Sequence, residues 1–450
     1  MNTTRKCTFE NLPAIVYNHV KPMLGKCLSV FGCAGLVLGA WVSLAAGCPA
    51  EECRVRDGIA RSAAKLAAGG DFTVAYLGGS ITLQRGWRVK YTDWLRKRFP
   101  KARVKGVCAG LSGTGSGVGV FRMDEEVLAK NPDLLFVEFA TNDTYIDPTI
   151  VRRAMEGIVR KTWRHDPETD IVFVYTIADH MTNCYLKGEC PRAATAHEAV
   201  ADRYGVPSIC FGVRVADLLK RGKLVMGLNA EAFPVPAETP DRADRVRDLL
   251  AKEGRVLFSK DGTHPMDGGH ALYLDCFTDS FDRLTAPPPA DHAKRLSGAP
   301  LDAANYEKAK FVPLDRAMLV GSGWRPLPAD DPKMRKFGTR TGPLWHSATV
   351  GDSLRFRFRG TSFGVYDLIG PDGCRLEVLV DGETAAKPRD RYNHWSKKSH
   401  MFLPEFPFAS CADGEHAVEL RITPRCDGAT AFYPSKLMIV GDLLEESTRK

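Results

Sequence analysis

Short apolar runs alternate with amphipathic segments over the first half of the chain. Runs rich in β-branched and aromatic residues indicate buried strands at 72–77, 103–107, 133–139 and 171–177. Helical periodicity predicts helices at 87–99, 121–130, 149–163 and 193–204. A further short apolar run after the last of them predicts a strand at 206–210. This alternation predicts a parallel sheet covered by helices on both faces, with its ligand site outside the carboxyl ends of the strands.

The pattern changes after residues 286–300, a stretch with three consecutive prolines and no periodicity. Beyond it, short runs separated by turn signals predict strands at 354–358, 363–368, 375–380, 417–422 and 437–440. We therefore expect an all-β sandwich of jelly-roll type. The expected organisation is an N-terminal segment 1–48, an α/β domain 49–285, a linker 286–300 and a β-sandwich accessory domain 301–450.

The N-terminal segment has the pattern of an export signal. Residues 27–47 carry no charge, and two lysines precede them while two glutamates follow shortly after. Three alternatives remain open: a cleaved signal peptide, a retained membrane anchor, or a lipobox-like site that places a lipid on Cys48. Each one places the rest of the chain outside the cytoplasm, as a periplasmic, cell-surface or secreted protein that meets a membrane only through this segment.

Composition narrows the class of protein. A hydrophobic fraction of 44% over 450 residues excludes wholesale disorder. The net charge is +8, of which +3 precedes residue 48, so the remainder gives little reason to expect nucleic-acid binding.

Ten of the thirteen cysteines lie from Cys48 onward, where an oxidising location permits disulfides. The pairs Cys184–Cys190 and Cys411–Cys426 are candidates by position. No cysteine or histidine spacing indicates a zinc site.

Polar motifs follow the first three predicted strands. They are Gly78-Gly79-Ser80, Ser112-Gly113 and Thr141-Asn142-Asp143. A fourth motif precedes a helical pattern further along the chain and reads Asp261-Gly262-Thr263-His264-Pro265. Because the site of such a sheet lies at the carboxyl ends of its strands, we expect these motifs to converge.

The motifs contain the groups that nucleophilic catalysis requires. A serine such as Ser80 attacks a carbonyl when an imidazole takes its proton, and a carboxylate orients that imidazole. The spacing of Asp261 and His264 lets the carboxylate reach one ring nitrogen while the other faces the serine. The N–H groups of Ser80 and Gly113 and the side-chain amide of Asn142 are candidate donors to an oxyanion.

These four blocks, in this order, resemble those of the SGNH, or GDSL-type, hydrolase superfamily of serine esterases. The resemblance covers roughly residues 70–285. It implies a three-layer α/β/α, flavodoxin-like domain. It also implies Ser80 as the nucleophile, Asp261 and His264 as the rest of the triad, and an oxyanion hole formed by Ser80, Gly113 and Asn142.

Gly79 departs from the family pattern, because the family has an acidic residue beside the serine. That position is outside the triad, so the departure concerns fine geometry and specificity. Neither a metal nor a cofactor is expected, since the nucleophile is a side chain and amides supply the electrophilic aid. The glycine-rich run 110–119 lacks the P-loop and dinucleotide fingerprints. His197 is expected to be structural, and His180, after the fourth strand, is a candidate to line the pocket.

The sequence thus predicts an exported serine esterase that removes acetyl or other small acyl groups from carbohydrate. A lipase or small-ester esterase and an O-acyltransferase with the same triad are alternatives. An inactive carbohydrate-binding or adhesion module is an alternative of another class. The sugar part of this prediction is what the resemblance to exported SGNH enzymes with an attached β-sandwich implies. An aromatic cluster in the second half forms either sandwich core or rim, or a sugar-binding surface: Trp324, Trp345, Tyr392, His394 and Trp395.

Overall fold

The computed structural model describes residues 48–385 and 387–444. The predicted export signal therefore lies outside the described residues, apart from Cys48. No helix in the two described ranges has the length and apolar character needed to cross a membrane.

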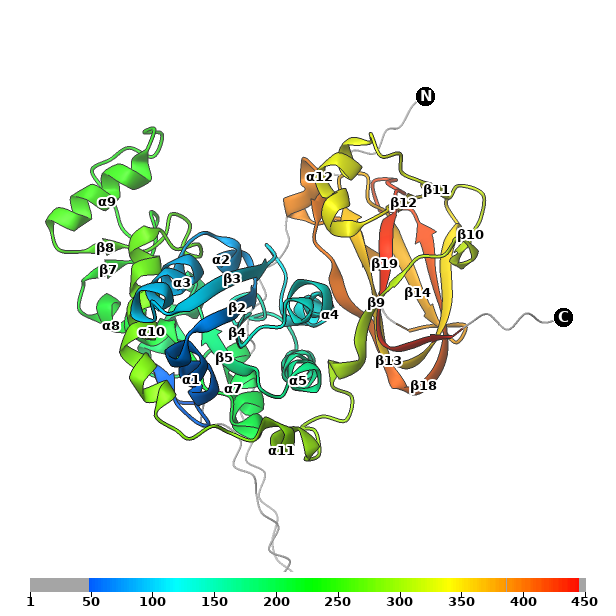
Figure 1. Cartoon of the computed structure of the whole chain (residues 1–450). Helices are drawn as coiled ribbons and strands as arrows, with labels where there is room; N and C mark the ends of the chain where they lie inside the picture. The colour runs from blue at the N-terminus through cyan, green and yellow to red at the C-terminus, as the bar shows by residue number, and fades with distance from the viewer. Residues whose placement is uncertain (1–47, 386, 445–450) are drawn as a thin grey trace, which may run out of the picture. The chain divides into compact units, whose positions relative to one another are not determined.

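A six-stranded sheet forms the centre of the first half (Figure 1). Its strands are β1 (Cys53–Arg54), β2 (Gly70–Gly78), β3 (Ala102–Gly110), β4 (Leu134–Glu138), β5 (Asp170–Tyr175) and β6 (Ser208–Cys210). They lie in the order β1-β6-β5-β4-β2-β3, and all pairs are parallel except β1 with β6. The five parallel strands follow the flavodoxin-like order 2-1-3-4-5, whose switch point lies between β2 and β4. The predicted fold class is confirmed.

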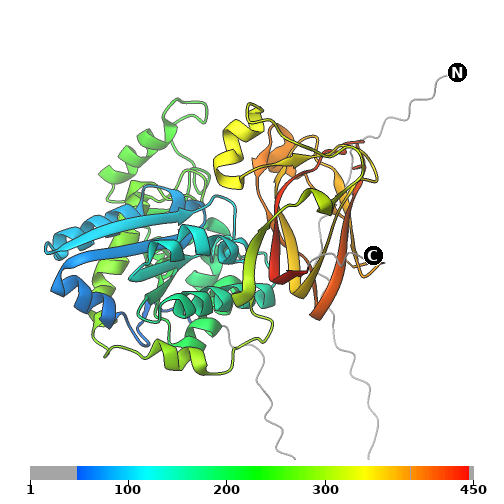
Figure 2. The same cartoon turned by 45° about the vertical axis from the view of Figure 1, so that its right-hand side comes forward.

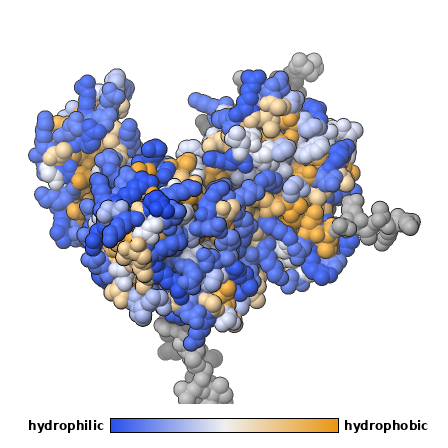
Figure 3. Space-filling view, in the orientation of Figure 1, coloured by the Kyte–Doolittle hydropathy of each residue, from blue (hydrophilic) through white to orange (hydrophobic). Residues whose placement is uncertain are grey.

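Helices cover both faces of this sheet (Figures 1 and 2). One face carries α1 (Ala60–Ala68), α3 (Trp87–Arg98), α8 (Phe211–Lys220) and α10 (Asp267–Thr285). The other carries α4 (Ser116–Glu126), α5 (Pro148–His165) and α7 (Arg192–Tyr204). Shorter helices α2 (Ser80–Leu83) and α6 (Thr182–Leu186) follow β2 and β5. Hydrophilic side chains dominate the face of the molecule shown in Figure 3, as expected once the apolar strands are buried.

The α4 helix begins five residues before its predicted start at 121. The backbone N–H of Ser116 donates to the Asp143 carboxylate at 2.9 Å, so a side chain remote in sequence caps this helix. A second unpredicted feature is an excursion between α8 and α10, formed by β7 (Leu224–Val225), α9 (Arg242–Lys252) and β8 (Val256–Leu257). It has a small apolar cluster of its own.

The second half contains a nine-stranded sheet with the main order β15-β14-β18-β13-β19-β9. These strands are β9 (Ala309–Pro313), β13 (Ser353–Ile369), β14 (Arg375–Val380), β15 (Glu383–Thr384), β18 (Glu405–Thr423) and β19 (Tyr433–Leu444), and all their pairings are antiparallel. The strands predicted at 354–358 and 363–368 form one strand, β13, with a register shift between Gly360 and Ser362. The helix α12 (Pro332–Thr341) was not predicted.

The stretch 286–300 contains the short helix α11 (His292–Ser297), and the chain beyond it packs against the first half. Buried Tyr306 and Phe406 belong to the same apolar cluster as the six-stranded sheet, and the rings of Phe121 and Phe406 lie 4.6 Å apart. The Lys161 ammonium donates to the carbonyl of Ala309 at 2.8 Å. Residues after 300 therefore complete the core that the first half begins.

All ten cysteines of the described ranges are free thiols in this structure, so neither pair proposed from sequence spacing is formed in it. The Cys190 thiol lies against the carbonyl of Pro49 rather than Cys184. Cys411 is on β18 and Cys426 is exposed after that strand. Sequence spacing does not report which way each side chain faces.

Candidate active site

The turn after β2 places Ser80 at the first position of α2, at the switch point of the sheet. A Cβ atom on Gly78 would lie 2.4 Å from the Thr82 hydroxyl, and one on Gly79 would lie 2.1 Å from Asn142 Oδ1. Both distances are far shorter than any van der Waals contact, so neither position accepts a side chain without displacing its neighbour. The close approach of Asn142 leaves no room for a side chain at Gly79, the position where the family pattern has an acidic residue.

A continuous hydrogen-bond chain joins Ser80, His264 and Asp261. His264 Nε2 lies 2.8 Å from Ser80 Oγ, and His264 Nδ1 lies 2.7 Å from Asp261 Oδ2. Because a carboxylate accepts at Nδ1, that nitrogen carries the proton and Nε2 is left to accept one from the serine. The geometry is therefore that of a serine, its base and the group that orients the base.

The Asp261 carboxylate is held by its own turn. Its Oδ1 accepts hydrogen bonds from the Ser259 hydroxyl at 2.8 Å and from the backbone N–H groups of Thr263 and His264 at 2.9 and 2.8 Å. Partial burial opposes ionisation, but these bonds and the His264 ring outweigh it and hold the pKa of Asp261 well below its ordinary value. Asp261 is thus a permanent anion at neutral pH, as the orienting role requires.

Gly113 and Asn142 are the other two candidate donors to the oxyanion. Gly113 has φ of +73°, a left-handed conformation that favours glycine, and Asn142 lies against Gly79 of the nucleophile turn. Both line a cavity of about 330 Å³. Residues after 300 form its opposite wall and include Tyr392, Asn393 and Leu403. The second half of the chain therefore contributes to the surroundings of the candidate oxyanion hole.

Asp143 and His197 form a buried pair that sequence reasoning missed. The two side chains are 1% and 0% exposed, and His197 Nε2 lies 3.0 Å from Asp143 Oδ2. The other carboxylate oxygen caps α4 through Ser116. His197, expected to be structural, thus helps to hold the loop that carries Asn142. An Asn-Asp motif followed by a histidine on the apolar face of a helix was the available signal.

Glu138, at the end of β4, is a second buried group that was missed. It is 1% exposed and accepts hydrogen bonds from the hydroxyls of Thr176 at 2.7 Å and Thr82 at 2.9 Å. Burial raises the pKa of Glu138 to about 7, although these bonds and the backbone of Gly79 oppose the rise. Glu138 therefore links the turn that carries Ser80 to the residue that follows β5. An acidic residue ending an apolar strand was the signal.

Some of the remaining residues that the sequence suggested for the site lie on the surface, and others are buried in the core. His180 is exposed, and its ring stacks on the ring of Tyr145, with the ring centroids 5.4 Å apart. Tyr145 lies three residues after Asn142 in the chain. In the aromatic cluster, Trp324 is buried and Trp345 packs partly against the same core. By contrast, Tyr392 lines the cavity and Trp395 is 69% exposed. In the described ranges, no three His, Cys, Asp or Glu side chains gather as metal ligands.

Comparison with known proteins finds one matching family model and two similar two-domain structures. Residues 75–272 match the model of the GDSL-like lipase/acylhydrolase family. The chain is also similar to two structures of a two-domain esterase (CEX) active on acetylated mannans, one of them co-crystallized with mannopentaose. For the mannopentaose structure the identity is 21%, the TM-score is 0.63, and the match covers 87% of this chain and 97% of that one. For the other structure the identity is 22%, the TM-score is 0.64, and the match covers 86% of this chain and 97% of that one.

At such identity the two structures establish the shared fold, including the second half of the chain. No curated protein matches the sequence significantly.

Proposed function

We propose that this chain, a carboxylic ester hydrolase whose residues 75–272 match the GDSL-like lipase/acylhydrolase family, removes acetyl or similar small acyl groups from carbohydrate. The observation that carries this proposal is the chain of hydrogen bonds from Ser80 through His264 to Asp261. The same observation favours catalysis over an inactive binding module.

The proposed reaction has two halves. Ser80 Oγ attacks the ester carbonyl while His264 Nε2 accepts its proton, and Asp261 stabilises the resulting imidazolium. The N–H groups of Ser80 and Gly113 and the Asn142 amide stabilise the oxyanion. Collapse of the tetrahedral intermediate releases the alcohol, which takes the proton from His264, and leaves an acyl group on Ser80. Water, deprotonated by the same imidazole, then releases the acid.

Carbohydrate as the alcohol is supported by the cavity wall. Tyr392 and Asn393 face the same cavity as Asn142, and an aromatic ring beside an amide suits a sugar, whose C–H faces stack and whose hydroxyls hydrogen-bond. A buried ion pair next to Tyr392 stabilises this wall. Arg391 Nε and Nη2 each donate a hydrogen bond to one carboxylate oxygen of Asp367, both at 2.7 Å. The shared fold with an esterase active on acetylated mannans adds support.

We further propose that residues 49–285 are the hydrolase domain and 301–450 a β-sandwich accessory domain, and that the protein is exported. The uncharged segment before Cys48 supports export.

The test combines a small ester with a polymer. The protein is expected to hydrolyse p-nitrophenyl acetate, and Ser80→Ala to abolish this activity with the fold intact by circular dichroism. Acetate release from a panel of acetylated polysaccharides then identifies the substrate. Retained activity in Ser80→Ala contradicts the reaction, and release from small esters alone contradicts the carbohydrate assignment.

The contribution of the second half is best tested by a point change, because truncation would expose the shared core around Tyr306. Trp395→Ala is expected to raise KM on the acetylated polysaccharide about 10-fold and to leave p-nitrophenyl acetate hydrolysis unchanged. Val350→Ala is the matched control, because Val350 is also exposed on the same half, whereas Trp395 alone of the two follows the cavity-lining residues Tyr392 and Asn393 closely in the chain. An equal effect of both changes contradicts a sugar-binding role for Trp395.

A further inference from the structure

The first described residues of the chain pair with the segment between α6 and α7. Pro49 and Glu189 form an antiparallel bridge. The backbone N–H of Cys190 donates to the carbonyl of Cys48, and that of Ala50 donates to the carbonyl of Gly188, both at 2.8 Å. One step along this pairing, Cys48 and Cys190 are directly opposite each other.

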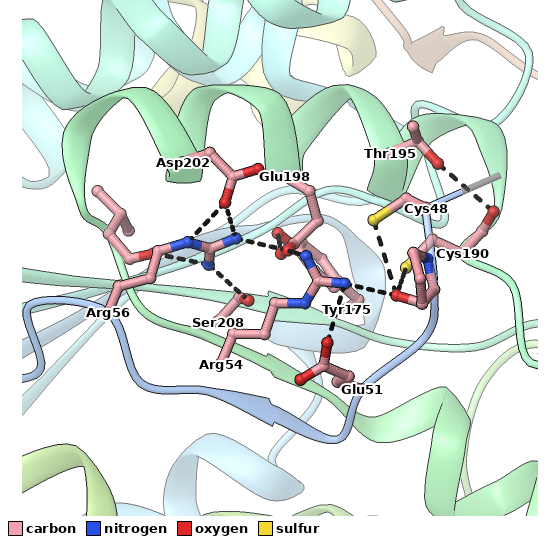
Figure 4. Close-up of polar contacts among 12 residues, drawn as sticks. Cys48, Glu51, Arg54, Arg56, Tyr175, Cys190, Thr195, Glu198, Asp202 and Ser208 are labelled. Atoms are coloured by element: carbon pink, nitrogen blue, oxygen red, sulfur yellow. Dashed lines mark hydrogen bonds and ion pairs between the residues drawn. The ribbon is translucent and has the colours of Figure 1, made fainter. Parts of the chain in front are cut away.

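This position suits a covalent cross-link. Opposite residues in a hydrogen-bonded antiparallel pair have Cα atoms about 5.5 Å apart, and disulfides join Cα atoms roughly 4.4–6.8 Å apart. Both thiols also lie against one acceptor, since the sulfurs of Cys48 and Cys190 are 3.7 and 3.5 Å from the carbonyl oxygen of Pro49. Figure 4 shows the two sulfurs converging on that oxygen.

The surroundings of Cys190 give its thiol a structural rather than a reactive character. Burial raises the pKa of the Cys190 thiol, and the nearby thiols of Cys210 and Cys48 raise it further. A raised thiol pKa disfavours the thiolate that nucleophilic catalysis or metal binding needs.

The segment that carries Cys48 is already attached to α7 by charges (Figure 4). Arg54 and Arg56 both pair with Glu198 of α7, at 2.9 and 2.6 Å, and Glu198 is almost fully buried. Glu198 follows His197, whose ring is bonded to Asp143 beside the site. A bond at Cys190, two residues before α7 begins, would fasten the start of the same helix.

We propose that Cys48 and Cys190 are joined by a disulfide that fixes the N-terminal segment to the start of α7. In this oxidation the two thiols lose two protons and two electrons, the Sγ–Sγ bond forms, and an external disulfide is reduced to two thiols. The inference rests on the exported location in the proposed function. It also opposes lipid attachment, because one sulfur cannot form a thioether and a disulfide together.

Peptide mapping tests the bond directly. The full chain is treated with oxidised glutathione, alkylated without reduction, digested and analysed by mass spectrometry. The expected result is a peptide that links Cys48 to Cys190 and disappears after dithiothreitol. Alkylation of both cysteines, or a lipid on Cys48, overturns the proposal. The Ser80→Ala protein is expected to give the same link, so failure of the esterase assignment is distinguishable from failure of the disulfide.

Thermal unfolding supplies a second test. In the oxidised state, Cys48→Ser, Cys190→Ser and the double variant are each expected to lower Tm by the same amount, about 5–10 °C, because any of them removes the one bond. Dithiothreitol is expected to bring the wild type to the same Tm. Cys108→Ser is the matched control, since Cys108 is exposed on β3. Additive effects of the two single changes, or no effect of dithiothreitol, contradict the bond.

Discussion

Replacing Glu138 with glutamine is expected to remove a pH dependence of stability that this buried carboxyl creates. The pKa of Glu138 is about 7 in the folded protein and about 4.5 for the free group, because burial penalises the charged form. Below pH 4.5 the group is protonated in both states and contributes no pH dependence. Between pH 4.5 and 7 the folded state holds more protons, so the free energy of unfolding falls as pH rises. Above pH 7 the loss is complete.

The magnitude follows from the two pKa values. At about 1.4 kcal/mol per pKa unit, the difference between the two pKa values lowers the free energy of unfolding by about 3 kcal/mol between pH 4.5 and 7. Glutamine keeps the shape and the hydrogen-bonding capacity of the neutral acid toward Thr82 and Thr176 and has no charge to bury.

Urea unfolding of both proteins at several pH values measures this effect. The unfolding free energy of Glu138→Gln minus that of the wild type is expected to increase by about 3 kcal/mol from pH 4.5 to 7.5. Burial also raises the pKa of Asp170 and Asp367 to about 6, so these groups titrate in the same window. They are present in both proteins and cancel in the difference. Parallel pH profiles for the two proteins would refute the reasoning.

Three further predictions concern the candidate site and are measured as kcat on p-nitrophenyl acetate. Asn142→Ala removes one oxyanion donor and is expected to lower kcat about 10²- to 10³-fold, and a loss below 10-fold would exclude that role. Asp261→Asn leaves His264 without its anionic partner and is expected to lower kcat on the order of 10³- to 10⁴-fold, whereas near-normal turnover would contradict the triad. Gly79→Ala introduces a Cβ 2.1 Å from Asn142 Oδ1 and is expected to lower kcat about 10- to 100-fold. Gly414→Ala is the control that should keep full activity, because its Cβ would approach no atom more closely than His416 Nε2 at 3.7 Å.

The sheet of the first half was predictable because its strands are buried on both faces and appear as continuous apolar runs. Each predicted strand lies within a few residues of β2 to β6. The start of α4 was not predictable, because the cap on Ser116 comes from Asp143, which is distant in sequence. The excursion carrying α9 was also missed, since its small apolar cluster leaves only a weak pattern.

The sequence predicted those residues of the candidate site that belong to recognisable motifs, because the residue types and their order along the chain identify them. The structure places Ser80, His264 and Asp261 in contact, which the sequence only implied through converging strand ends. The groups behind them were missed, because Glu138 and His197 leave only weak local signals in the sequence and act through contacts between elements that share no motif. The cavity wall around Tyr392 was likewise hidden, since it depends on how the strands after residue 300 pack against the first half.

The most direct test of the central claim is to find which side chain is phosphorylated when an organophosphate ester inactivates the enzyme. After incubation with diethyl p-nitrophenyl phosphate, intact-mass and peptide analysis is expected to show one diethylphosphoryl group, located on Ser80, with loss of esterase activity in proportion to labelling. An active enzyme that stays unlabelled, or a label on another residue with activity lost in parallel, would contradict the assignment of Ser80 as the nucleophile.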